Sequence, residues 1–362
     1  MKCLIFAEFS KTGGTRSFLI DLLAIHYSHH ISTEVVFPFS DPEICSYIES
    51  LNFSYTIVPE RKPIFKKSYF SLLYEFYYYS KIISKAQPDL IVVSSATPGE
   101  NIFCFLSKIP SIYILHTPVQ QTTTKNRLML QIPALFSGAK KRIYTVSDFV
   151  KKSVLQNWQV KEEDVAVIYN SYRLDTSLTN SPVSNRVVLT LGHVIDYKNP
   201  LLWLKIAHQV NDAIPDVEFI WLGDGNMLSY MQELTKDAER INFVGHKSNI
   251  EAYYQKAYLY LQPSLKESLG ISVLDAMSMG IPTIVSNVEG LPETTKHMIT
   301  GFICVENNAN EYVEYITTLL NDEKLRNTMG AEAQRRACDV FSPKIQEKAI
   351  LSLYSCITSD NS

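Results

Sequence analysis

Short apolar runs rich in β-branched residues alternate with longer segments of helical periodicity along most of this 362-residue chain. Strands that are covered on both faces form continuous apolar runs, and their regular alternation with helices favours a mainly parallel sheet. In the first half we predict strands at Lys2–Phe9, Thr33–Pro38, Tyr55–Val58, Asp89–Ser94, Ser111–His116, Arg142–Val146 and Val165–Ile168. The chain is therefore predicted to have an α/β fold.

The alternation is interrupted by a polar segment at 177–185, which is typical of a linker. It resumes with predicted strands at Val187–Gly192, Val217–Leu222, Ile241–Val244, Ala257–Leu261 and Pro282–Val285, and with helices at about 200–210, from Met227 and near Gly270. A chain of this length fits two domains. We expect two Rossmann-like doubly wound domains, 1–176 and 186–342, facing across a ligand-binding cleft. Whether the last helical run, 343–358, completes the first domain is left open.

The composition is that of a globular protein, with 46% hydrophobic and 20% charged residues. A net charge of −3 argues against a nucleic-acid partner. The charge is uneven, because residues 1–181 carry 19 basic and 15 acidic groups and the remainder carries 15 and 22. The first half therefore has the more attractive field for an anionic partner.

The six cysteines are far apart and form no CxxC pair, so neither a zinc site nor a redox dithiol is predicted. Reduced cysteines in apolar runs favour a cytoplasmic protein. The apolar N-terminus is interrupted at Glu8 and fits a first strand better than a signal peptide. No run of about 18 apolar residues predicts a membrane-spanning helix.

Residues 264–293 are the most informative stretch of the chain. Glu267 ends the loop after a strand, and Gly270 allows the backbone to approach a ligand closely. The helix that follows would present the unpaired N–H groups of Gly270, Ile271 and Ser272, which suit a phosphate or diphosphate. Asp275 lies about one turn into that helix, where it could accept hydrogen bonds from ribose hydroxyls. The two carboxylates could thus hold the two ends of a sugar nucleotide.

This stretch resembles the E-x7-E motif of the retaining nucleotide-sugar glycosyltransferases with the GT-B fold, family four or "group 1". Asp275 stands where the second Glu is usual, and Glu289-Gly290 where Gly-Gly is common. The similarity continues along the chain in an ordered series of motifs: Thr12-Gly13-Gly14, Thr145-Val146-Ser147, Val167–Ser171, Leu191–Asn199, Leu222–Gly225 and Thr300–Phe302.

The resemblance implies roles for individual residues. Lys198 matches the family lysine that binds the diphosphate. His193 stands where Arg is usual and could assist if it is protonated, because Arg is always charged and His is not. Glu267 would accept from donor-sugar hydroxyls, and Asp275 from the ribose. The remaining nucleotide-sugar contacts are expected from Gly13, Gly14, Ser268, Leu269, Gly270 and Ile271.

Other implications concern the chemistry. His116, at the end of a predicted strand, matches a histidine that faces the donor sugar in relatives, so we expect Glu267, Lys198 and His116 to be the catalytic residues. The family needs no metal, and no metal or cofactor is expected here. The resemblance implies transfer with retention of the anomeric configuration, and a UDP-sugar is favoured over a GDP-sugar as the predicted donor. A glycan or lipid-linked acceptor would bind the first domain, in cell-surface polysaccharide or glycolipid biosynthesis.

Each of these residues also has a structural interpretation. Glu267 fits a residue beside a helix N-terminus, Asp275 and Lys198 fit solvated side chains, and His116 fits a hydrogen-bonded core histidine. Gly13-Gly14 fits a tight turn. Ser147 is best explained as a helix N-cap.

A basic and aromatic stretch in the first half suggests a membrane surface. Residues 61–85 contain six Lys or Arg and eight aromatic side chains against one acid, and 101–147 contain six basic residues and no acid. This combination suits an anionic membrane-water interface, which would place the protein peripherally at the inner face of the membrane. The alternative is a core-packed helix with solvated lysines.

Two competing functions are considered. One is a sugar-nucleotide epimerase on the same fold, which would need further acid and base residues. The other is a catalytically degenerate subunit that binds a nucleotide or scaffolds a complex, an alternative favoured by His193 and Asp275 in place of the usual residues.

Overall fold

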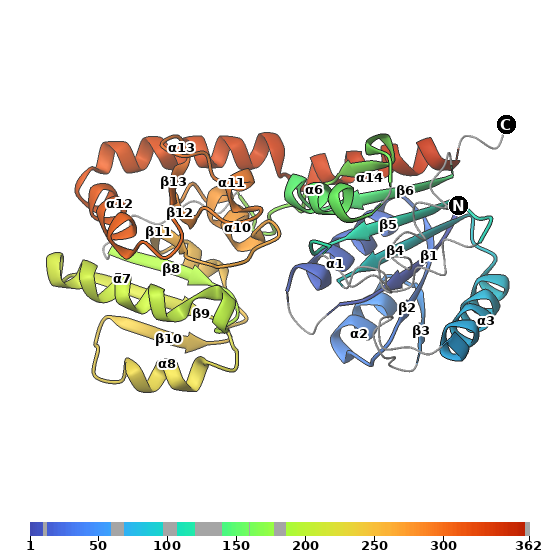
Figure 1. Cartoon of the computed structure of the whole chain (residues 1–362), viewed down its shortest axis with the longest axis horizontal. Helices are drawn as coiled ribbons and strands as arrows, with labels where there is room; N and C mark the ends of the chain where they lie inside the picture. The colour runs from blue at the N-terminus through green and yellow to red at the C-terminus, as the bar shows by residue number, and fades with distance from the viewer. Residues whose placement is uncertain are drawn as a thin grey trace. The chain divides into compact units, whose positions relative to one another are not determined.

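The computed structural model describes residues 1–9, 13–58, 69–96, 107–119, 140–158, 160–176 and 186–358. The chain divides into two compact units, each shown in Figure 1. Unit 1 contains Met1–Tyr169 and Glu347–Ser362, and unit 2 contains Asn170–Gln346. The predicted linker at 177–185 lies outside the described residues, and the predicted domain bounds remain a prediction.

Unit 1 contains a seven-stranded sheet in which every pair of neighbours is parallel, with the order β3-β2-β1-β4-β5-β6-β7. Its strands are β1 (Lys2–Ala7), β2 (Ser32–Phe37), β3 (Ser54–Ile57), β4 (Leu90–Ser95), β5 (Ser111–Leu115), β6 (Lys141–Thr145) and β7 (Val165–Val167). The central strands β1, β4 and β5 are buried almost throughout, as expected for a sheet covered on both faces.

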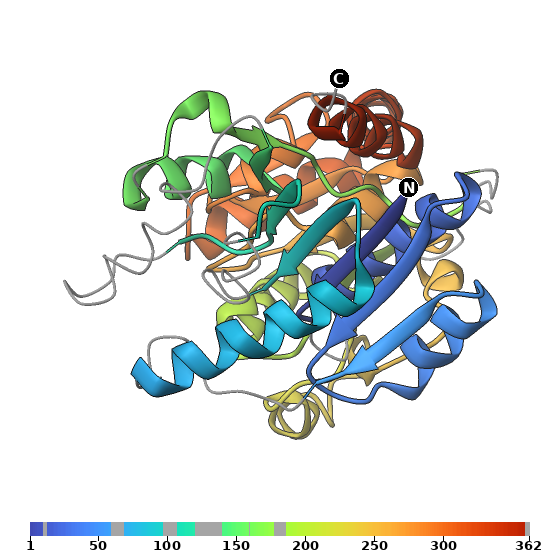
Figure 2. The ribbon, with the colours of Figure 1, turned by 90° about the vertical axis from the view of Figure 1, so that its right-hand side faces the viewer.

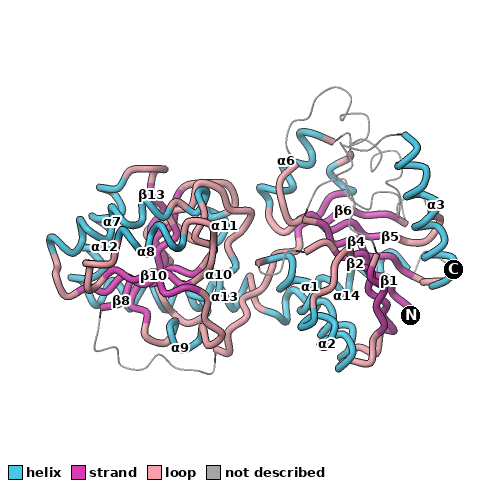
Figure 3. The backbone as a smooth tube through the Cα atoms, turned by 90° about the horizontal axis from the view of Figure 1, so that it is seen from below, coloured by secondary structure: helices cyan, strands magenta, loops and turns pink. Residues whose placement is uncertain are grey.

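Helices cover both faces of this sheet, so the strands form the middle layer (Figure 3). Alternate strand residues such as Ile5 and Val92 pack against α1 (Gly14–Ser28), α2 (Pro42–Ser50) and α14 (Pro343–Thr358). Their neighbours, such as Leu4 and Val93, pack against α3 (Tyr69–Ala86) and α6 (Asp148–Asn157). The helix α3 is seen lengthwise in Figure 2.

The last helix of the chain packs in the core of unit 1. Ile350, Leu353, Tyr354 and Ile357 of α14 belong to the same buried cluster as α1 and α2. His26 of α1 lies between two partners there: its Nδ1 is 2.8 Å from Thr33 Oγ1 and its Nε2 is 2.8 Å from Tyr354 Oη. Burial lowers the pKa of His26 to about 3, so the ring is neutral at physiological pH.

Unit 2 contains a six-stranded, wholly parallel sheet with the order β10-β9-β8-β11-β12-β13. Its strands are β8 (Arg186–Leu191), β9 (Val217–Leu222), β10 (Ile241–Gly245), β11 (Ala257–Gln262), β12 (Thr283–Ser286) and β13 (Gly301–Cys304). Its helices are α7 (Pro200–Ala213), α8 (Leu228–Leu234), α9 (Glu251–Tyr254), α10 (Ile271–Ser278), α11 (Leu291–Thr294), α12 (Ala309–Asn321) and α13 (Glu323–Val340).

Aromatic residues dominate the core of unit 2. Trp203 of α7 meets Trp221 of β9 and Phe243 of β10 edge-on, with ring centroids 5.4 and 5.0 Å away. Its Nε1 donates to Thr190 Oγ1 at 2.8 Å, which satisfies the polar atom of a fully buried side chain. Tyr312 and Ile316 of α12 complete the same cluster.

The structure confirms the predicted fold class, an α/β protein with two Rossmann-like doubly wound units. The predicted strands are all present, with ends displaced by no more than two residues. The short edge strand β13 was not predicted as a strand.

Candidate functional site

The strand order of unit 2 changes direction between β8 and β11. From β8 the sheet continues to β9 and β10, whereas from β11 it continues to β12 and β13 in the opposite direction. The connections that leave two such neighbouring parallel strands diverge at their carboxyl ends, where ligands of open α/β sheets bind. The loops after β8 and β11 therefore form the candidate ligand-binding site of unit 2.

The loop after β8 is fixed by main-chain contacts with β9. The Gly192 N–H donates to the Leu222 carbonyl at 2.9 Å, and the Trp221 indole N–H donates to the Gly192 carbonyl at 2.9 Å. A single turn of 3-10 helix, Asp196–Lys198, then places Lys198 just before α7. A Cβ on Gly192 would lie 3.9 Å from Lys198 Cε, so the lysine side chain extends over this glycine.

The loop after β11 is tied to the Lys198 turn and contains buried polar groups. The Leu265 N–H donates to the Tyr197 carbonyl at 2.8 Å, which joins the two loops. Gln262 is 1% exposed, and its amide donates to Ser264 Oγ at 2.7 Å and to Glu267 Oε2 at 3.4 Å. The Tyr260 hydroxyl is 2.9 Å from Gln262 Oε1 and orients this amide.

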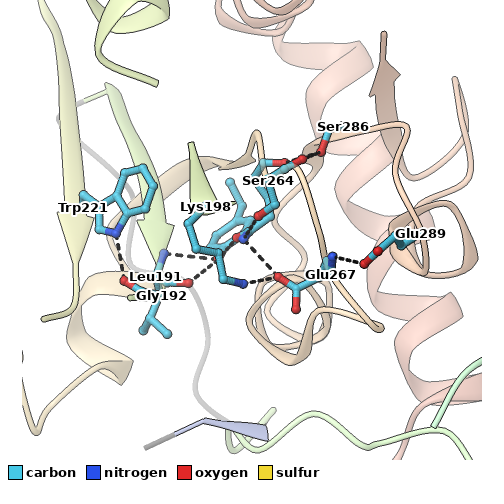
Figure 4. A network of polar contacts seen from close by, with 10 residues as sticks. Leu191, Gly192, Lys198, Trp221, Ser264, Glu267, Ser286 and Glu289 are labelled. Carbon is cyan, nitrogen blue, oxygen red and sulfur yellow. Dashed lines mark hydrogen bonds and ion pairs between the residues drawn. The ribbon is translucent and has the colours of Figure 1, made fainter. Parts of the chain in front are cut away.

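Lys198 and Glu267 form an ion pair between Nζ and Oε2 (Figure 4). The two side chains are 12% and 16% exposed, so the pair is partly desolvated but still reaches solvent. An ammonium group has three donors. Lys198 can therefore hold Glu267 and an incoming anion together, or exchange the carboxylate for the anion.

Gly270 lies beside this pair at the start of α10. Its φ of +96° is in the region that favours glycine, and a Cβ there would lie 2.9 Å from Leu291 Cδ2 and 3.4 Å from Glu267 Cγ. Among the residues that the structure describes, no acceptor is found for the N–H groups of Gly270, Ile271 and Ser272. These three donors, at the positive end of the helix dipole, would bind an anion.

Asp275 is completely buried in α10, and its carboxylate is bound by Arg173. Its Oδ1 accepts from the Arg173 backbone N–H at 2.7 Å, and its Oδ2 accepts from the guanidinium Nε at 3.1 Å and from Nη2. Both oxygens therefore have partners within the chain. The ribose contact of Asp275 stays a prediction, and it would require this carboxylate to share the oxygens that Arg173 binds.

The remaining predicted residues of unit 2 lie around the same loops. His193 is half-buried directly after Gly192. Ser268 and Ile271 are half-buried, whereas Leu269 is 2% exposed. The structure thus brings Lys198, His193, Glu267 and the start of α10 to one edge of the sheet.

Three predicted residues belong to unit 1. Gly13, with φ of +114°, and Gly14 are exposed at the start of α1; their neighbour Thr12 lies outside the described residues. His116, directly after β5, is 6% exposed, with Nε2 3.0 Å from Ser94 Oγ and its ring against Phe18. Burial lowers the pKa of His116 to about 3, so it is a neutral hydrogen-bonding group, and its catalytic role stays a prediction.

Sequence reasoning did not identify the roles of Gln262, Arg173 and Glu289. Gln262 ends a buried strand, and a polar residue at the carboxyl end of a strand was the available signal. Glu289 was noticed only as a departure from Gly-Gly. Nothing in the sequence pairs Arg173 with Asp275, because the two are 102 residues apart.

The described ranges contain neither a candidate membrane span nor a candidate metal-binding cluster. No helix in them combines the length and hydropathy needed to cross a membrane. No group of three or more His, Cys, Asp or Glu side chains in the same ranges is placed to hold a metal ion.

The fold is that of the GT-B glycosyltransferases. A glycosyltransferase from Rickettsia africae superposes with a TM-score of 0.85 at 17% identity, covering 100% of this chain and 99% of that one. HepE from Anabaena, solved in complex with UDP-glucose, superposes with a TM-score of 0.79 at 21% identity, covering 98% and 99%.

The family follows from the sequence comparison. The family model described as Glycosyltransferase Family 4 matches residues 13–176, and the one described as Glycosyl transferases group 1 matches residues 177–336. The chain belongs to this family of glycosyltransferases and is a transferase, which confirms the family named from the sequence motifs.

Two curated relatives illustrate the range of the family. An uncharacterized glycosyltransferase of Haemophilus influenzae is 25% identical over 78% of this chain and 80% of its own length. The UDP-Gal:alpha-D-GlcNAc-diphosphoundecaprenol alpha-1,3-galactosyltransferase of Escherichia coli is 27% identical over 57% of this chain and 54% of its own length.

Proposed function

We propose that this protein transfers a sugar from a nucleoside-diphosphate sugar, with UDP as the nucleotide, to a glycan or lipid-linked acceptor, with retention of the anomeric configuration and without a metal ion. The observation that carries the proposal is the Lys198–Glu267 ion pair beside the unpaired amides at the start of α10. The Escherichia coli relative named for UDP-Gal and the HepE complex with UDP-glucose support the choice of nucleotide.

The charges at this site match those that develop when a sugar–diphosphate bond breaks. Negative charge accumulates on the leaving β-phosphate, where the Lys198 ammonium and the N–H groups of Gly270 and Ile271 would stabilise it. The Glu267 carboxylate would accept hydrogen bonds from hydroxyls of the donor sugar, whose anomeric carbon becomes positive. Preorganised donors and acceptors of this kind lower the barrier because they need no reorganisation during the reaction.

The bond changes in the proposed reaction balance without a further reactant. The bond between the anomeric carbon and the β-phosphate oxygen breaks, and the acceptor oxygen forms its bond to that carbon on the same face. The proton of the acceptor hydroxyl passes to the leaving phosphate oxygen. In this scheme no enzyme carboxylate forms a covalent intermediate, which distinguishes it from double displacement.

The donor nucleotide can be identified by thermal shift with UDP, GDP, ADP and their sugars. A ligand that binds only the folded state raises stability by RT ln(1 + [L]/Kd), so the preferred base gives the largest shift. We expect UDP to give it and the Lys198→Ala variant to lose it. Lys205→Ala, which removes an exposed lysine of α7, is the matched control and should keep it. A larger shift with GDP would overturn the choice of base.

Transfer itself tests the role of the ion pair. Removal of one charge-stabilising group typically lowers the rate by about 10²- to 10³-fold, and we expect this for Lys198→Ala and for Glu267→Ala. Wild-type turnover in both variants would exclude the proposed site. The stereochemistry of the product, read by NMR, tests retention. Epimerised donor formed without acceptor would support the epimerase instead.

Metal independence has its own test. The purified protein should keep its rate after treatment with EDTA, and added Mg²⁺ or Mn²⁺ should not raise that rate. Loss of transfer on chelation and recovery with a divalent cation would show that a metal supplies part of the phosphate stabilisation.

We also propose that unit 1 rests on an anionic membrane, where it would meet a lipid-linked acceptor at the inner face. Supporting this, α3 exposes Tyr74 and Tyr77, which are 62% and 56% exposed. Lys81 Nζ lies 4.6 Å from the centre of the Tyr77 ring, and Lys85 is also exposed on this helix. Aromatic rings and flexible basic side chains on one helix suit the interface of an anionic bilayer.

Co-sedimentation with vesicles tests the membrane proposal. Wild-type protein should pellet with vesicles that contain phosphatidylglycerol at low salt, less at moderate salt, and not with pure phosphatidylcholine. The Tyr74→Ser, Tyr77→Ser double variant should bind less, whereas Tyr230→Ser, which removes an exposed tyrosine of unit 2, should not. Absence of lipid-dependent pelleting would remove this proposal and leave the transferase proposal intact.

A further inference from the structure

Glu289 has a backbone conformation that a glycine would adopt more easily. It follows β12 in the turn before α11, and its φ is +46°. Residues with a Cβ rarely occupy this left-handed region, and those that do often lie at functional sites, where the surrounding structure holds them. The sequence has a glutamate here, and its side chain makes a contact that glycine would lack.

That contact is a charge-assisted hydrogen bond to the main chain of Glu267. One carboxylate oxygen of Glu289, Oε2, accepts from the Glu267 backbone N–H at 2.6 Å (Figure 4). The following residue, Gly290, donates its own N–H to the Glu267 carbonyl at 2.9 Å. Both main-chain polar groups of Glu267 are therefore held by the 289–290 turn.

The turn also lies too close to the Glu267 loop for either to shift freely. A Cβ on Gly290 would lie 2.0 Å from the Ser268 carbonyl oxygen. Leu291 packs against Gly270 from the same side, since a Cβ on Gly270 would meet its Cδ2 at 2.9 Å. The loop that ends at the start of α10 is thus clamped along its length.

The side-chain carboxylate of Glu267 has other partners than its backbone. Lys198 and the Gln262 amide bind Oε2, whereas the 289–290 turn binds only the backbone. The side-chain direction of Glu267 therefore depends on both sets of contacts.

We infer that Glu289 is a positioning residue of the donor site: its carboxylate fixes the main chain of Glu267, and thereby aims the Glu267 side chain at the donor sugar. This inference rests on the proposed function. Glu289 contributes no contact to the substrate itself and acts through Glu267. Positioning of this kind matters because small displacements of a reacting-site group reduce the rate strongly.

The ionisation of Glu289 allows a second test, the dependence of the transfer rate on pH. Burial and the nearby Glu267 carboxylate raise the pKa of Glu289, whereas the Glu267 N–H and the ammonium groups of Lys266 and Lys198 oppose the rise. Protonation weakens a carboxylate as an acceptor. A protonated carboxyl still has a neutral oxygen that accepts, as an amide does. As pH falls, protonation of Glu289 should therefore lower transfer by no more than Glu289→Gln does at neutral pH, and this part of the decline should be absent from Glu289→Gln.

Two variants separate the hydrogen bond from the backbone conformation. Glu289→Gly relaxes the left-handed residue and removes the bond, so the protein should stay folded while kcat falls by about 100-fold. Glu289→Gln keeps an oxygen that can accept from Glu267, so its kcat at neutral pH should stay within about threefold of the wild type. Met298→Gly, which relaxes an exposed left-handed residue elsewhere in unit 2, is the matched control and should keep full kcat.

A double variant shows whether Glu289 acts through Glu267. With Glu267→Ala already present, Glu289→Gly should cause no further loss of kcat. Additive losses, equal losses in Glu289→Gln and Glu289→Gly, or full activity in Glu289→Gly would each overturn the inference. If the wild type transfers sugar and Lys198→Ala does not, the proposed function stands whatever these variants show.

Discussion

Arg173 binds both carboxylate oxygens of Asp275, one through its backbone N–H and the other through its guanidinium. This pair connects the start of unit 2 to the middle of α10. Asp275 has no exposed surface, and the Arg173 side chain is 32% exposed. An ion pair with one fully buried partner holds its elements in register, because either group left alone would be an uncompensated charge.

Arg173→Ala should therefore destabilise unit 2. Removing one partner of a buried pair costs about 3 kcal/mol or more, since the remaining carboxylate keeps only the backbone N–H. Chemical denaturation measures the change. Arg335→Ala, whose partner Glu332 lies on the same exposed helix face, is the control and should lower the free energy of unfolding much less, because water screens an exposed pair. Equal stabilities of the two variants would show that Asp275 does not depend on Arg173.

The His26–Tyr354 hydrogen bond should stabilise the attachment of α14 to unit 1. The Thr33 hydroxyl donates to the Ile31 carbonyl, so His26 Nδ1 donates to Thr33 and Nε2 accepts from Tyr354. Tyr354→Phe leaves that buried nitrogen without a donor, which should cost about 1–3 kcal/mol. Hydrogen exchange of α1 and α14 would report it. Tyr230→Phe, at an exposed position, should change nothing.

Acid should destabilise unit 1 through its two buried histidines. Burial lowers the pKa of His26 and of His116 to about 3, from an ordinary value of 6.5. Between these values the unfolded chain binds more protons than the folded one, so stability is complete above 6.5 and falls as pH decreases. Each histidine contributes a slope of about 1.4 kcal/mol per pH unit within that window. The free energy of unfolding of His26→Gln, measured by denaturation at several pH values, should depend less steeply on pH than that of the wild type, because one of the two contributions is absent. An unchanged dependence on pH would contradict this.

Gly290 and Gly280 should respond differently to alanine. At Gly290 a Cβ would collide with the Ser268 carbonyl at 2.0 Å, whereas at Gly280, with φ of +72°, the nearest atom would be 3.7 Å away. Gly280→Ala should cost only the backbone strain, about 1 kcal/mol. Gly290→Ala should cost about 3 kcal/mol and displace the Glu267 loop, so transfer should fall as well. Thermal denaturation and transfer rates measure both effects, and an equally mild change at Gly290 would contradict the close approach.

The repeating elements of the fold were predictable because buried parallel strands have a simple sequence pattern. Runs such as Leu90–Ser95 and Val217–Leu222 are mainly apolar and bounded by polar turns, so their positions follow from the sequence. The edge strand β13 begins at a glycine, which is a common turn residue, and this weakens the local signal for a strand. Its pairing with β12 decides its structure, and pairing is not visible locally.

The candidate site could be predicted in part from the sequence. Gly270 and the helix after it were identified from local chain geometry, and Lys198 from the resemblance to the family. The contacts that orient these residues were not, because Arg173–Asp275, Lys198–Glu267 and Glu267–Glu289 join segments 22 to 102 residues apart. His116 illustrates the same limit, since its neutral state follows from burial against Phe18 and Ser94.

The membership of α14 in the core of unit 1 has a consequence for biosynthesis. A nascent chain emerging from the ribosome can form the strands of the first sheet early, but the part of its core around His26 stays incompletely covered until Tyr354 and the rest of residues 350–357 have been made. Uncovered apolar surface of this kind favours aggregation and chaperone binding. The first unit to be synthesised is therefore the last to be completed, and a fragment ending before α14 should aggregate.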